Sequence, residues 1–195
     1  MISVLPAGAA TASPEEIVKT TTESVLSRVS ADQDALRADP RRLEALVDEM
    51  IVPYFDFRRM AQWVLGKYWR EANPDAQARF VAEFRTMLIR TYATALLEYS
   101  HQKVNYYPNQ IDPAANHGIV KTELAQPGGV PIPIDYRMHR KDGEWKVFDV
   151  AVDGVSLLTT YRSSFAAEIR KSGIEALIAS LAARNNGPEP ATTAQ

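Results

Sequence analysis

The sequence contains no cysteine, only 3 histidines and no long apolar run. The lack of cysteine excludes disulfides, thiolate catalysis and cysteine-ligated metal sites. No stretch approaches the roughly 18 to 20 consecutive apolar residues that a membrane-spanning helix needs. Basic and acidic side chains nearly balance, at 22 and 24, for a formal net charge of −2. This balance argues against a general nucleic-acid binder, which shows a strong basic excess, and against electrostatic docking on anionic membranes.

The scarce residues also limit the kinds of active site. His101, His117 and His139 are the only histidines, and no two of them have the i, i+3 or i+4 spacing of a helical metal site. The sequence has no G-x-S-x-G nucleophile elbow, no P-loop and no G-x-G-x-x-G pattern. We therefore expect no metal, no nucleophilic catalysis and no cofactor.

The length of 195 residues and the hydrophobic fraction of 46% are typical of one globular domain. We expect this domain to span residues 13–186. Residues 1–12 are rich in small side chains and contain Ala7-Gly8-Ala9, so they are either a disordered N-terminus or the remnant of a secretory signal peptide. Residues 187–195 include two prolines and no large apolar side chain, which predicts a disordered tail.

Helix starts are marked by a capping residue followed by proline. Ser13-Pro14, Asp39-Pro40 and Asn73-Pro74 each place a capping side chain before a proline at the first helical position. The longest helix is expected from Asn73 to about Ser100, and its apolar residues cover more than one stripe. A helix that is apolar over so wide an arc needs partners on two sides, or one partner and a ligand.

Beyond His101 the apolar period changes from helical spacing to alternation. Four strands are expected, beginning near Val104, Val120, Ile132 and Glu144, and their short links predict an antiparallel meander. In the last strand, alternation places Phe148, Val150 and Val152 on one face and Asp149 on the other. The predicted fold class is α+β: a four-stranded curved meander wrapped by about six helices, as in an NTF2-like cone, around a large apolar cavity.

One long stretch carries a family resemblance. The segment from Glu144 to Phe165 reads E-W-K-V-F-D-V-A-V-D-G-V-S-L-L-T-T-Y-R-S-S-F, and F-D-F-R-R-M-A and V-L-G-K-Y-W lie upstream. Together these segments resemble the signature of the MlaC family, also called the toluene-tolerance family, over about Pro14 to Asn185. The family comprises periplasmic carriers that move phospholipid between membrane complexes in Gram-negative bacteria.

The resemblance implies a function and a set of partners. It implies a periplasmic, monomeric, non-catalytic carrier with phospholipid as cargo, which maintains the lipid asymmetry of the outer membrane. The implied partners are an inner-membrane ABC transporter assembly with a lipid-binding ring and an outer-membrane lipoprotein–porin complex. Composition alone instead favours a solid core, because apolar faces pack against one another by default.

The apolar strand and helix faces are the candidate walls of the cavity. Arg162, beside the hinge between the last strand and the following helix, is expected either to meet a lipid phosphate at the mouth or to pair with Asp149 or Asp153 and lock the hinge. The residues expected to contact acyl chains are Phe84, Met87, Leu88, Tyr92, Leu96, Tyr106, Ile132, Ile134, Tyr136, Phe148, Val150, Val152, Leu157, Tyr161 and Phe165.

Two other classes of function stay open at this point. Cone-shaped α+β folds also host isomerases and hydratases, which use a buried carboxylate and a tyrosine. Asp135, Asp149 or Asp153 could supply the carboxylate, and Tyr136 or Tyr161 the hydroxyl. That alternative predicts a carboxylate of raised pKa inside the cavity, although alternation places Asp135 and Asp149 outside it. The other alternative is an interaction module with a solid core and no ligand.

Overall fold

The computed structural model describes residues 12–108, 111–112 and 114–187. The segments for which the sequence predicts disorder or a signal remnant, at the two ends of the chain, lie outside the described residues except for Ala12 and Gly187.

Within these ranges the helices begin where the caps predict. Ser13 forms a complete capping box with Glu16, and the Asp39 and Asn73 side chains accept backbone N–H groups at the starts of their helices. Two short helices, α2 and α5, were not expected. The helical elements are α1 (Pro14–Ala31), α2 (Gln33–Ala38), α3 (Pro40–Met50), the 3-10 turn η1 (Val52–Tyr54), α4 (Phe57–Leu65), α5 (Lys67–Glu71), α6 (Pro74–Tyr99) and α7 (Leu157–Asn186).

The predicted antiparallel meander is confirmed, with one additional strand. Neighbouring strands pair in sequence order. The extra strand has two residues and folds back across the Asp153-Gly154 turn, so that Val155 pairs with Val152. The strands are β1 (Val104–Tyr106), β2 (His117–Leu124), β3 (Ile132–Lys141), β4 (Glu144–Val152) and β5 (Val155–Ser156).

A β-bulge in β4 changes which side chains share a face. Arg137 pairs with Asp149 but Met138 pairs with Val147, so Phe148 has no partner on β3. The extra residue interrupts the alternation of side chains along the strand. Simple alternation predicts that Phe148 and Val150 share a face, but the bulge places them on opposite faces. The Phe148 ring lies instead against His117 and His139.

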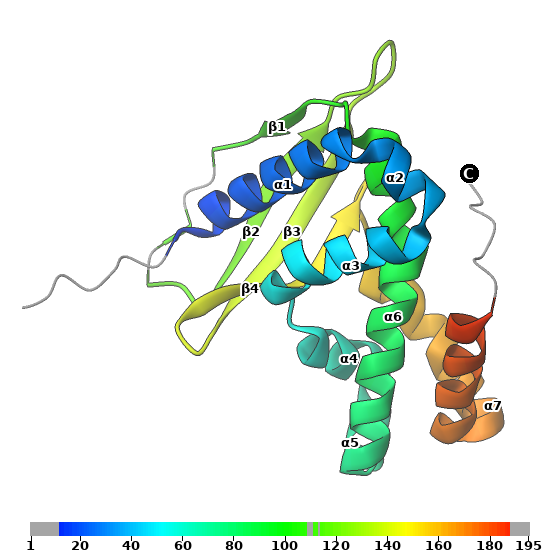
Figure 1. Cartoon of the computed structure of the whole chain (residues 1–195). Coiled ribbons are helices and arrows are strands. Elements are labelled where there is room, and N and C mark those ends of the chain that lie inside the picture. Colours follow the sequence, from blue (N-terminus) through cyan, green and yellow to red (C-terminus); the bar gives the residue numbers. More distant parts are fainter. Residues whose placement is uncertain (1–11, 109–110, 113, 188–195) are drawn as a thin grey trace, which may run out of the picture.

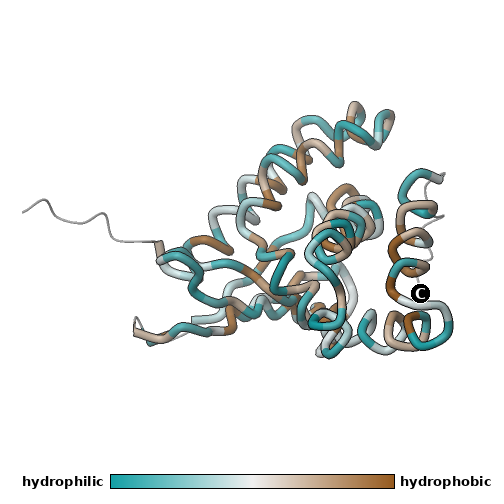
Figure 2. Tube along the Cα trace, turned by 90° about the horizontal axis from the view of Figure 1, so that it is seen from below, coloured by the Kyte–Doolittle hydropathy of each residue, from teal (hydrophilic) through white to brown (hydrophobic). Residues whose placement is uncertain are grey.

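The helices cover one face and one end of the sheet. In Figure 1, α1 and α3 cross in front of the strands and α6 runs along one side, while α4, α5 and α7 gather at the lower end. Apolar and polar residues alternate along helices and strands (Figure 2), so each element has a side that it can bury. This arrangement leaves the front face of the sheet, α1, α3 and the upper half of α6 turned toward one another.

The long helix α6 serves two different environments, which confirms that its wide apolar arc has more than one partner. Its first half packs with α4 and α7 in a core of aromatic rings, where Phe80, Phe84 and Phe165 lie within 6 Å of one another, centroid to centroid. Its second half packs through Ala93 and Leu97 against α1, α2 and α3.

Gly173 divides α7 into two helical segments. Its backbone angles, φ 81° and ψ 166°, are non-helical and are readily adopted only by glycine. Beyond this kink the second segment lies beside α6, where Arg79 forms an ion pair with Glu175 at 2.9 Å. α7 therefore consists of two helical segments that meet at the Gly173 kink.

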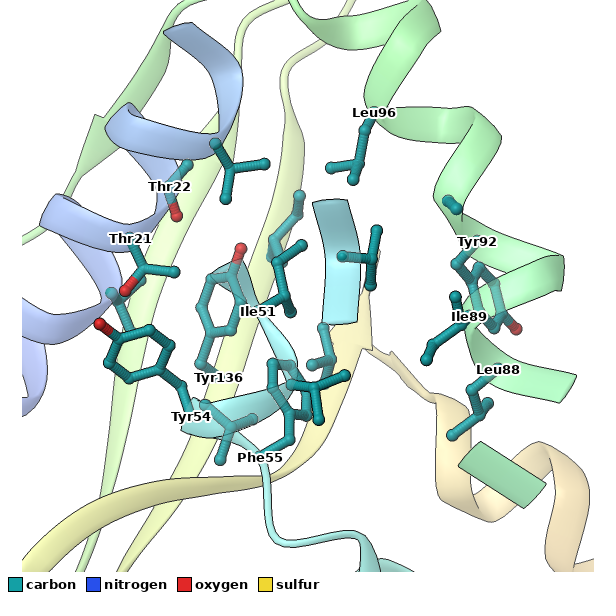
Figure 3. Close-up of a pocket in the computed structure, with 18 of the residues that line it drawn as sticks. Thr21, Thr22, Ile51, Tyr54, Phe55, Leu88, Ile89, Tyr92, Leu96 and Tyr136 are labelled. Carbon is teal, nitrogen blue, oxygen red and sulfur yellow. The ribbon is translucent and has the colours of Figure 1, made fainter. Parts of the chain in front are cut away.

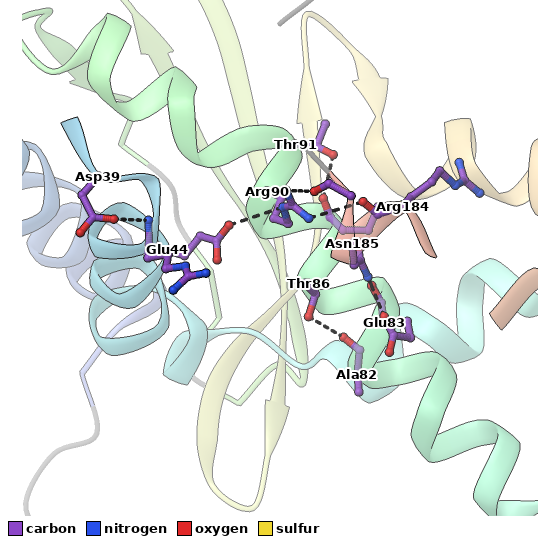
Figure 4. Close-up of polar contacts among 12 residues, drawn as sticks. Asp39, Glu44, Ala82, Glu83, Thr86, Arg90, Thr91, Arg184 and Asn185 are labelled. Atoms are coloured by element: carbon purple, nitrogen blue, oxygen red, sulfur yellow. Dashed lines mark hydrogen bonds and ion pairs between the residues drawn. The ribbon is translucent and has the colours of Figure 1, made fainter. Parts of the chain in front are cut away.

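Arg90, in the second half of α6, connects this helix to α3 and to the end of α7 (Figure 4). Its guanidinium donates to the carbonyl oxygen of Gly187 at 3.0 Å, at the end of α7, and faces the Glu44 carboxylate of α3 at 3.5 Å. Cationic groups bind well at helix C-termini because the last carbonyls lack helical partners. The neighbouring residue on α6, Ile89, lines the cavity described next.

Candidate binding pocket

A cavity of about 330 Å³ lies between the front face of the sheet and the helices α1, α3 and α6 (Figure 3). Within the described chain, none of its lining residues is charged, and its polar groups are the hydroxyls of two threonines and three tyrosines. The lining residues are Ile17, Val18, Thr21, Thr22, Val25, Leu26, Val47, Ile51, Val52, Tyr54, Phe55, Phe57, Met60, Leu88, Ile89, Tyr92, Ala93, Leu96, Ile134, Tyr136, Val147, Val150, Val152 and Leu157.

Secondary-structure periodicity explains how each element presents its share of the wall. On α6, Leu88, Tyr92 and Leu96 recur every four residues and so lie along one helix face. On β3, Ile134 and Tyr136 are two residues apart and point to the same side of the sheet. On β4, the bulge brings Val147 to the side that carries Val150 and Val152.

Phe55 and Phe57 close the pocket near β4. The segment between η1 and α4 is extended and forms a parallel bridge with Val147, so its alternate residues point in opposite directions. The two phenylalanine rings stack at 5.9 Å and line the cavity. Asp56, between them, is turned away from the cavity and is nearly fully buried.

Eight of the residues expected to line a cavity do so: Leu88, Tyr92, Leu96, Ile134, Tyr136, Val150, Val152 and Leu157. The other seven lie elsewhere. Phe84 and Phe165 are buried in the aromatic core, and Met87, Phe148 and Tyr161 pack against that core. Tyr106 packs beside Val18 and Met138, and Ile132 is half-buried at the start of β3.

Sequence reasoning did not assign the contribution of α1 to the cavity. Ile17, Val18, Thr21 and Val25 follow helical spacing and share one face, but the helix period does not say what that face covers. The structure places this face over the sheet, where it forms one wall of the cavity (Figure 3).

Three lining residues also reach solvent and so mark openings of the cavity. Tyr54, Tyr92 and Val152 are each more than a third exposed. The hydroxyls of Tyr92 and Tyr161 lie 3.3 Å apart. Partial burial and this neighbouring hydroxyl raise the pKa of Tyr92, so its hydroxyl stays protonated and uncharged. The openings are therefore framed by neutral groups.

The carboxylates considered for acid–base catalysis are not among the lining residues. Asp149 is buried behind the sheet face, where it accepts a hydrogen bond from the Ser156 hydroxyl at 2.7 Å and pairs with Arg137 at 3.3 Å. Its other oxygen faces the Leu158 backbone N–H at 3.4 Å. Asp149 thus organises the turn from β4 into α7. Asp153 is exposed in that turn.

Arg162 joins α7 to α4 and does not take either of the acidic partners expected for it. It donates to the Trp63 carbonyl oxygen at 3.2 Å, and its guanidinium lies 4.9 Å from the centre of the Trp63 ring. The Trp63 carbonyl belongs to the last turn of α4. Carbonyl oxygens in the last turn of a helix have no N–H donor within the helix, so they are free to accept from a side chain. Asp149 is instead paired with Arg137.

Neither a metal site nor a membrane span is found in the described residues. No group of three or more histidine or acidic side chains there could hold a metal ion. No helix among them is both long enough and apolar enough to cross a membrane.

Comparison with known proteins identifies the family. The model of the MlaC protein family matches residues 19–183. The chain belongs to the MlaC family. This result confirms the resemblance carried by the segment from Glu144 to Phe165.

Relatives and a solved structure extend this result. The chain is 28% identical to the intermembrane phospholipid transport system binding protein MlaC of Haemophilus influenzae, over 85% of this chain and 79% of that one. It is 27% identical to the toluene tolerance protein ttg2D of Pseudomonas putida, over 82% and 74%. A phospholipid-binding protein from Ralstonia solanacearum, solved in complex with a phospholipid, is 33% identical and matches with a TM-score of 0.82 over 89% of this chain and 97% of that one.

Proposed function

We propose that this protein is a non-catalytic phospholipid carrier that encloses acyl chains in the pocket between the sheet and α1, α3 and α6. The observation that carries the proposal is a pocket without charged lining residues in a MlaC-family chain whose fold matches a phospholipid-bound structure. An isomerase or hydratase would need a carboxylate in this lining, and the lining has none within the described residues.

The free energy of removing acyl chains from water explains why such a carrier encloses its cargo. Each methylene removed from water contributes about 0.8 kcal/mol, so two chains of roughly 15 methylenes contribute about 25 kcal/mol. A surface groove that covered half of this area would leave a prohibitive barrier to crossing an aqueous space. An enclosed apolar pocket removes that barrier and, because it offers few hydrogen bonds, can also release the lipid.

The size of the cavity implies that its walls move. At about 330 Å³ it is at the lower end of the range of ligand sites and is smaller than two full acyl chains. We propose that α1 or the Phe55–Phe57 segment shifts outward from the sheet when a two-chain phospholipid is loaded.

The cellular setting follows from the family as part of the same proposal. A carrier between two membranes works in the periplasm. Its partners would be an inner-membrane ABC transporter assembly with a lipid-binding ring and an outer-membrane lipoprotein–porin complex. The name of the Haemophilus relative, an intermembrane transport system binding protein, supports this setting.

Native mass spectrometry of the purified protein, followed by organic extraction and lipid analysis, tests the proposal. We expect a mass excess that resolves into phospholipid in near-stoichiometric amount. An apo mass, with no lipid in the extract and none taken up from phospholipid vesicles, would contradict the carrier function.

A further inference from the structure

Behind the pocket wall, Asp56 connects the segment that carries Phe55 and Phe57 to the rear face of the sheet. Its backbone N–H donates to the Val147 carbonyl oxygen at 2.8 Å, which fixes the segment along the edge of β4. Its side chain is only 7% exposed and points away from the cavity that its two neighbours line. A contact made by this carboxylate therefore holds both phenylalanines in place.

The Asp56 carboxylate has partners on both α4 and β3. One oxygen accepts the Arg59 backbone N–H at 3.0 Å and caps α4. The other lies 3.2 Å from His139 Nε2 and 3.2 Å from Lys141 Nζ. Burial alone would raise the pKa of Asp56, but the Arg59 backbone N–H, Lys141 and His139 together hold it below its usual value. The carboxylate is thus charged and binds the start of α4 to β3.

Arg59 defines the protonation state of two histidines in this cluster. Its guanidinium lies 3.1 Å from His139 Nδ1, 2.9 Å from His117 Nε2 and 4.7 Å from the centre of the Phe148 ring. A guanidinium can only donate, so both imidazole nitrogens must accept. His139 therefore carries its proton on Nε2 and donates it to Asp56. The network is complete only while both rings are neutral.

Additional protons would break the contacts between Arg59 and the two rings, while the hydrogen bond from His139 Nε2 to Asp56 would remain. A proton on His139 Nδ1 or His117 Nε2 would set an N–H group against the N–H groups of Arg59. Burial lowers the pKa of His139, the Arg59 charge lowers it further, and Asp56 only partly opposes both effects. Asp56 is the single carboxylate that contacts His139 and Lys141 among the ion pairs described.

The other charged groups that β3 and β4 place on this face do not compensate, since Asp149 is paired with Arg137 at 3.3 Å. Lys146, the cross-strand neighbour of His139 on β4, donates to the Pro53 carbonyl oxygen at 3.0 Å and pairs with Glu144 at 2.7 Å. Its charge adds to the cost of protonating His139, because both lie on the same face of paired strands.

We propose that Asp56, His139 and Arg59 form a latch that positions the Phe55–Phe57 wall of the pocket, and that protonation of His139 releases it by setting a second positive charge against Arg59. This latch rests on the proposed function in one respect, namely that the pocket it closes holds lipid. Asp56 and His139 are positioning residues, since they act on the pocket through the two phenylalanines. The latch would couple lipid release to a more acidic environment.

The direction of the pH effect follows from linkage. A histidine whose folded-state pKa lies below its usual value of 6.5 favours the closed state above that value. This contribution is lost as the pH falls below 6.5 toward the lower folded-state pKa. The pKa of Asp56 is also lowered, so Asp56 stabilises the closed state at pH values above its usual pKa of 3.8. This stabilisation is lost only at pH values below 3.8. Opening in mildly acidic solution therefore reports on His139.

Hydrogen–deuterium exchange of the amides of residues 55–57, together with phospholipid retention, tests the latch between about pH 7.5 and about pH 5. In the native chain we expect protection to fall by about tenfold or more, after correction for intrinsic exchange rates, and bound phospholipid to decrease in parallel. His117→Gln/His139→Gln should make both measurements independent of pH, because glutamine can donate and accept but does not titrate.

His101→Gln is the matched control. His101 is the remaining histidine, is exposed, and contacts only Gln33 among the bonds described, at 3.3 Å. This variant should respond to pH as the native chain does. Asp56→Asn should raise exchange at residues 55–57 by about tenfold at about pH 7.5, because the cap to Arg59 can persist while the ionic contacts are lost, with unchanged far-UV circular dichroism.

Each contrary result has a distinct meaning. Constant protection of residues 55–57 in the native chain across this pH range would overturn the latch whatever the lipid result. A pH response in the double glutamine variant equal to that of the native chain would also overturn it. Absence of lipid from the native chain at every pH would contradict the proposed function, and the exchange data would still decide the latch.

Discussion

The two halves of α6 border different interiors: the first half packs in a filled aromatic core, and the second half borders the cavity. Around its first half, Phe80 and Phe84 interlock with Phe165 at angles from stacked to perpendicular, and Phe80 and Phe84 have no exposed surface. Around its second half, aliphatic residues such as Leu88 and Leu96 face a cavity. Rigid rings that meet edge to face leave little space between them, whereas the cavity is lined mainly by branched aliphatic chains that can move apart. One helix thus joins a rigid support to an adaptable pocket.

The largest effect should come from making a cavity in the filled half. Phe84→Ala removes a fully buried ring that contacts Phe80, Tyr161 and Phe165, and we expect the free energy of unfolding to fall by about 3–5 kcal/mol. Urea denaturation followed by circular dichroism measures this. Leu96→Ala, at the pocket, is the matched truncation and should cost clearly less, because its side chain already borders empty space. Equal costs would remove the distinction between the halves.

A charged side chain in the lining of the cavity should reduce lipid binding more than it reduces the stability of the fold. Val150→Asp places a carboxylate among apolar lining residues, and burying an unpaired charge against acyl chains costs several kcal/mol. We expect phospholipid retention to fall by at least about a hundredfold in protein that remains folded by circular dichroism. Val130→Asp, at an exposed position outside the lining, is the control. Normal lipid content in folded Val150→Asp protein would exclude Val150 from the lipid site.

Larger side chains in the two halves should give a smaller difference in the free energy of unfolding. Ala61→Leu enlarges a side chain that is fully buried in the aromatic core, and we expect a loss of about 1–3 kcal/mol in the free energy of unfolding. Val150→Phe enlarges a side chain that borders the cavity and should cost less than about 1 kcal/mol while reducing lipid uptake from vesicles. The reverse order of unfolding energies would show that the pocket is as tightly packed as the core.

The smallest effect concerns Arg162, which belongs to the filled half. Arg162→Ala removes an exposed cation–π contact and a hydrogen bond to the Trp63 carbonyl, so we expect a loss of about 1 kcal/mol in stability and unchanged lipid content. Thermal denaturation and lipid extraction measure the two quantities. Arg170→Ala, at an exposed position on the same helix, is the control. Loss of lipid without loss of stability would instead assign Arg162 to the headgroup.

Local signals predicted most of the architecture. The caps at Ser13, Asp39 and Asn73 mark helix starts because a side chain there satisfies free backbone N–H groups, an interaction that depends on neighbours in sequence. The meander followed from alternation and short links. The short helices α2 and α5 were missed, since five or six residues contain too little periodicity to detect.

The candidate site was predicted only in part, for reasons that concern distances between elements. Phe84 and Leu88 lie one turn apart on α6 and belong to the same buried cluster, yet only Leu88 also borders the cavity. Phe148 was expected beside Val150, but the bulge in β4 reversed its face. A bulge depends on how two strands pair, and this pairing is not visible in the alternation of one strand.

The sequence by itself determined the apolar sides of most elements, where the longer helices α1, α3 and α6 begin, the order of the four main strands and the membership of a family. Only the tertiary structure decided which apolar faces meet and which remain apart, that α1 covers the sheet, and that Asp56 and His139 join behind the Phe55–Phe57 wall. The physical reason is that periodicity records the preference of a surface for burial, whereas a cavity is a property of the space between surfaces.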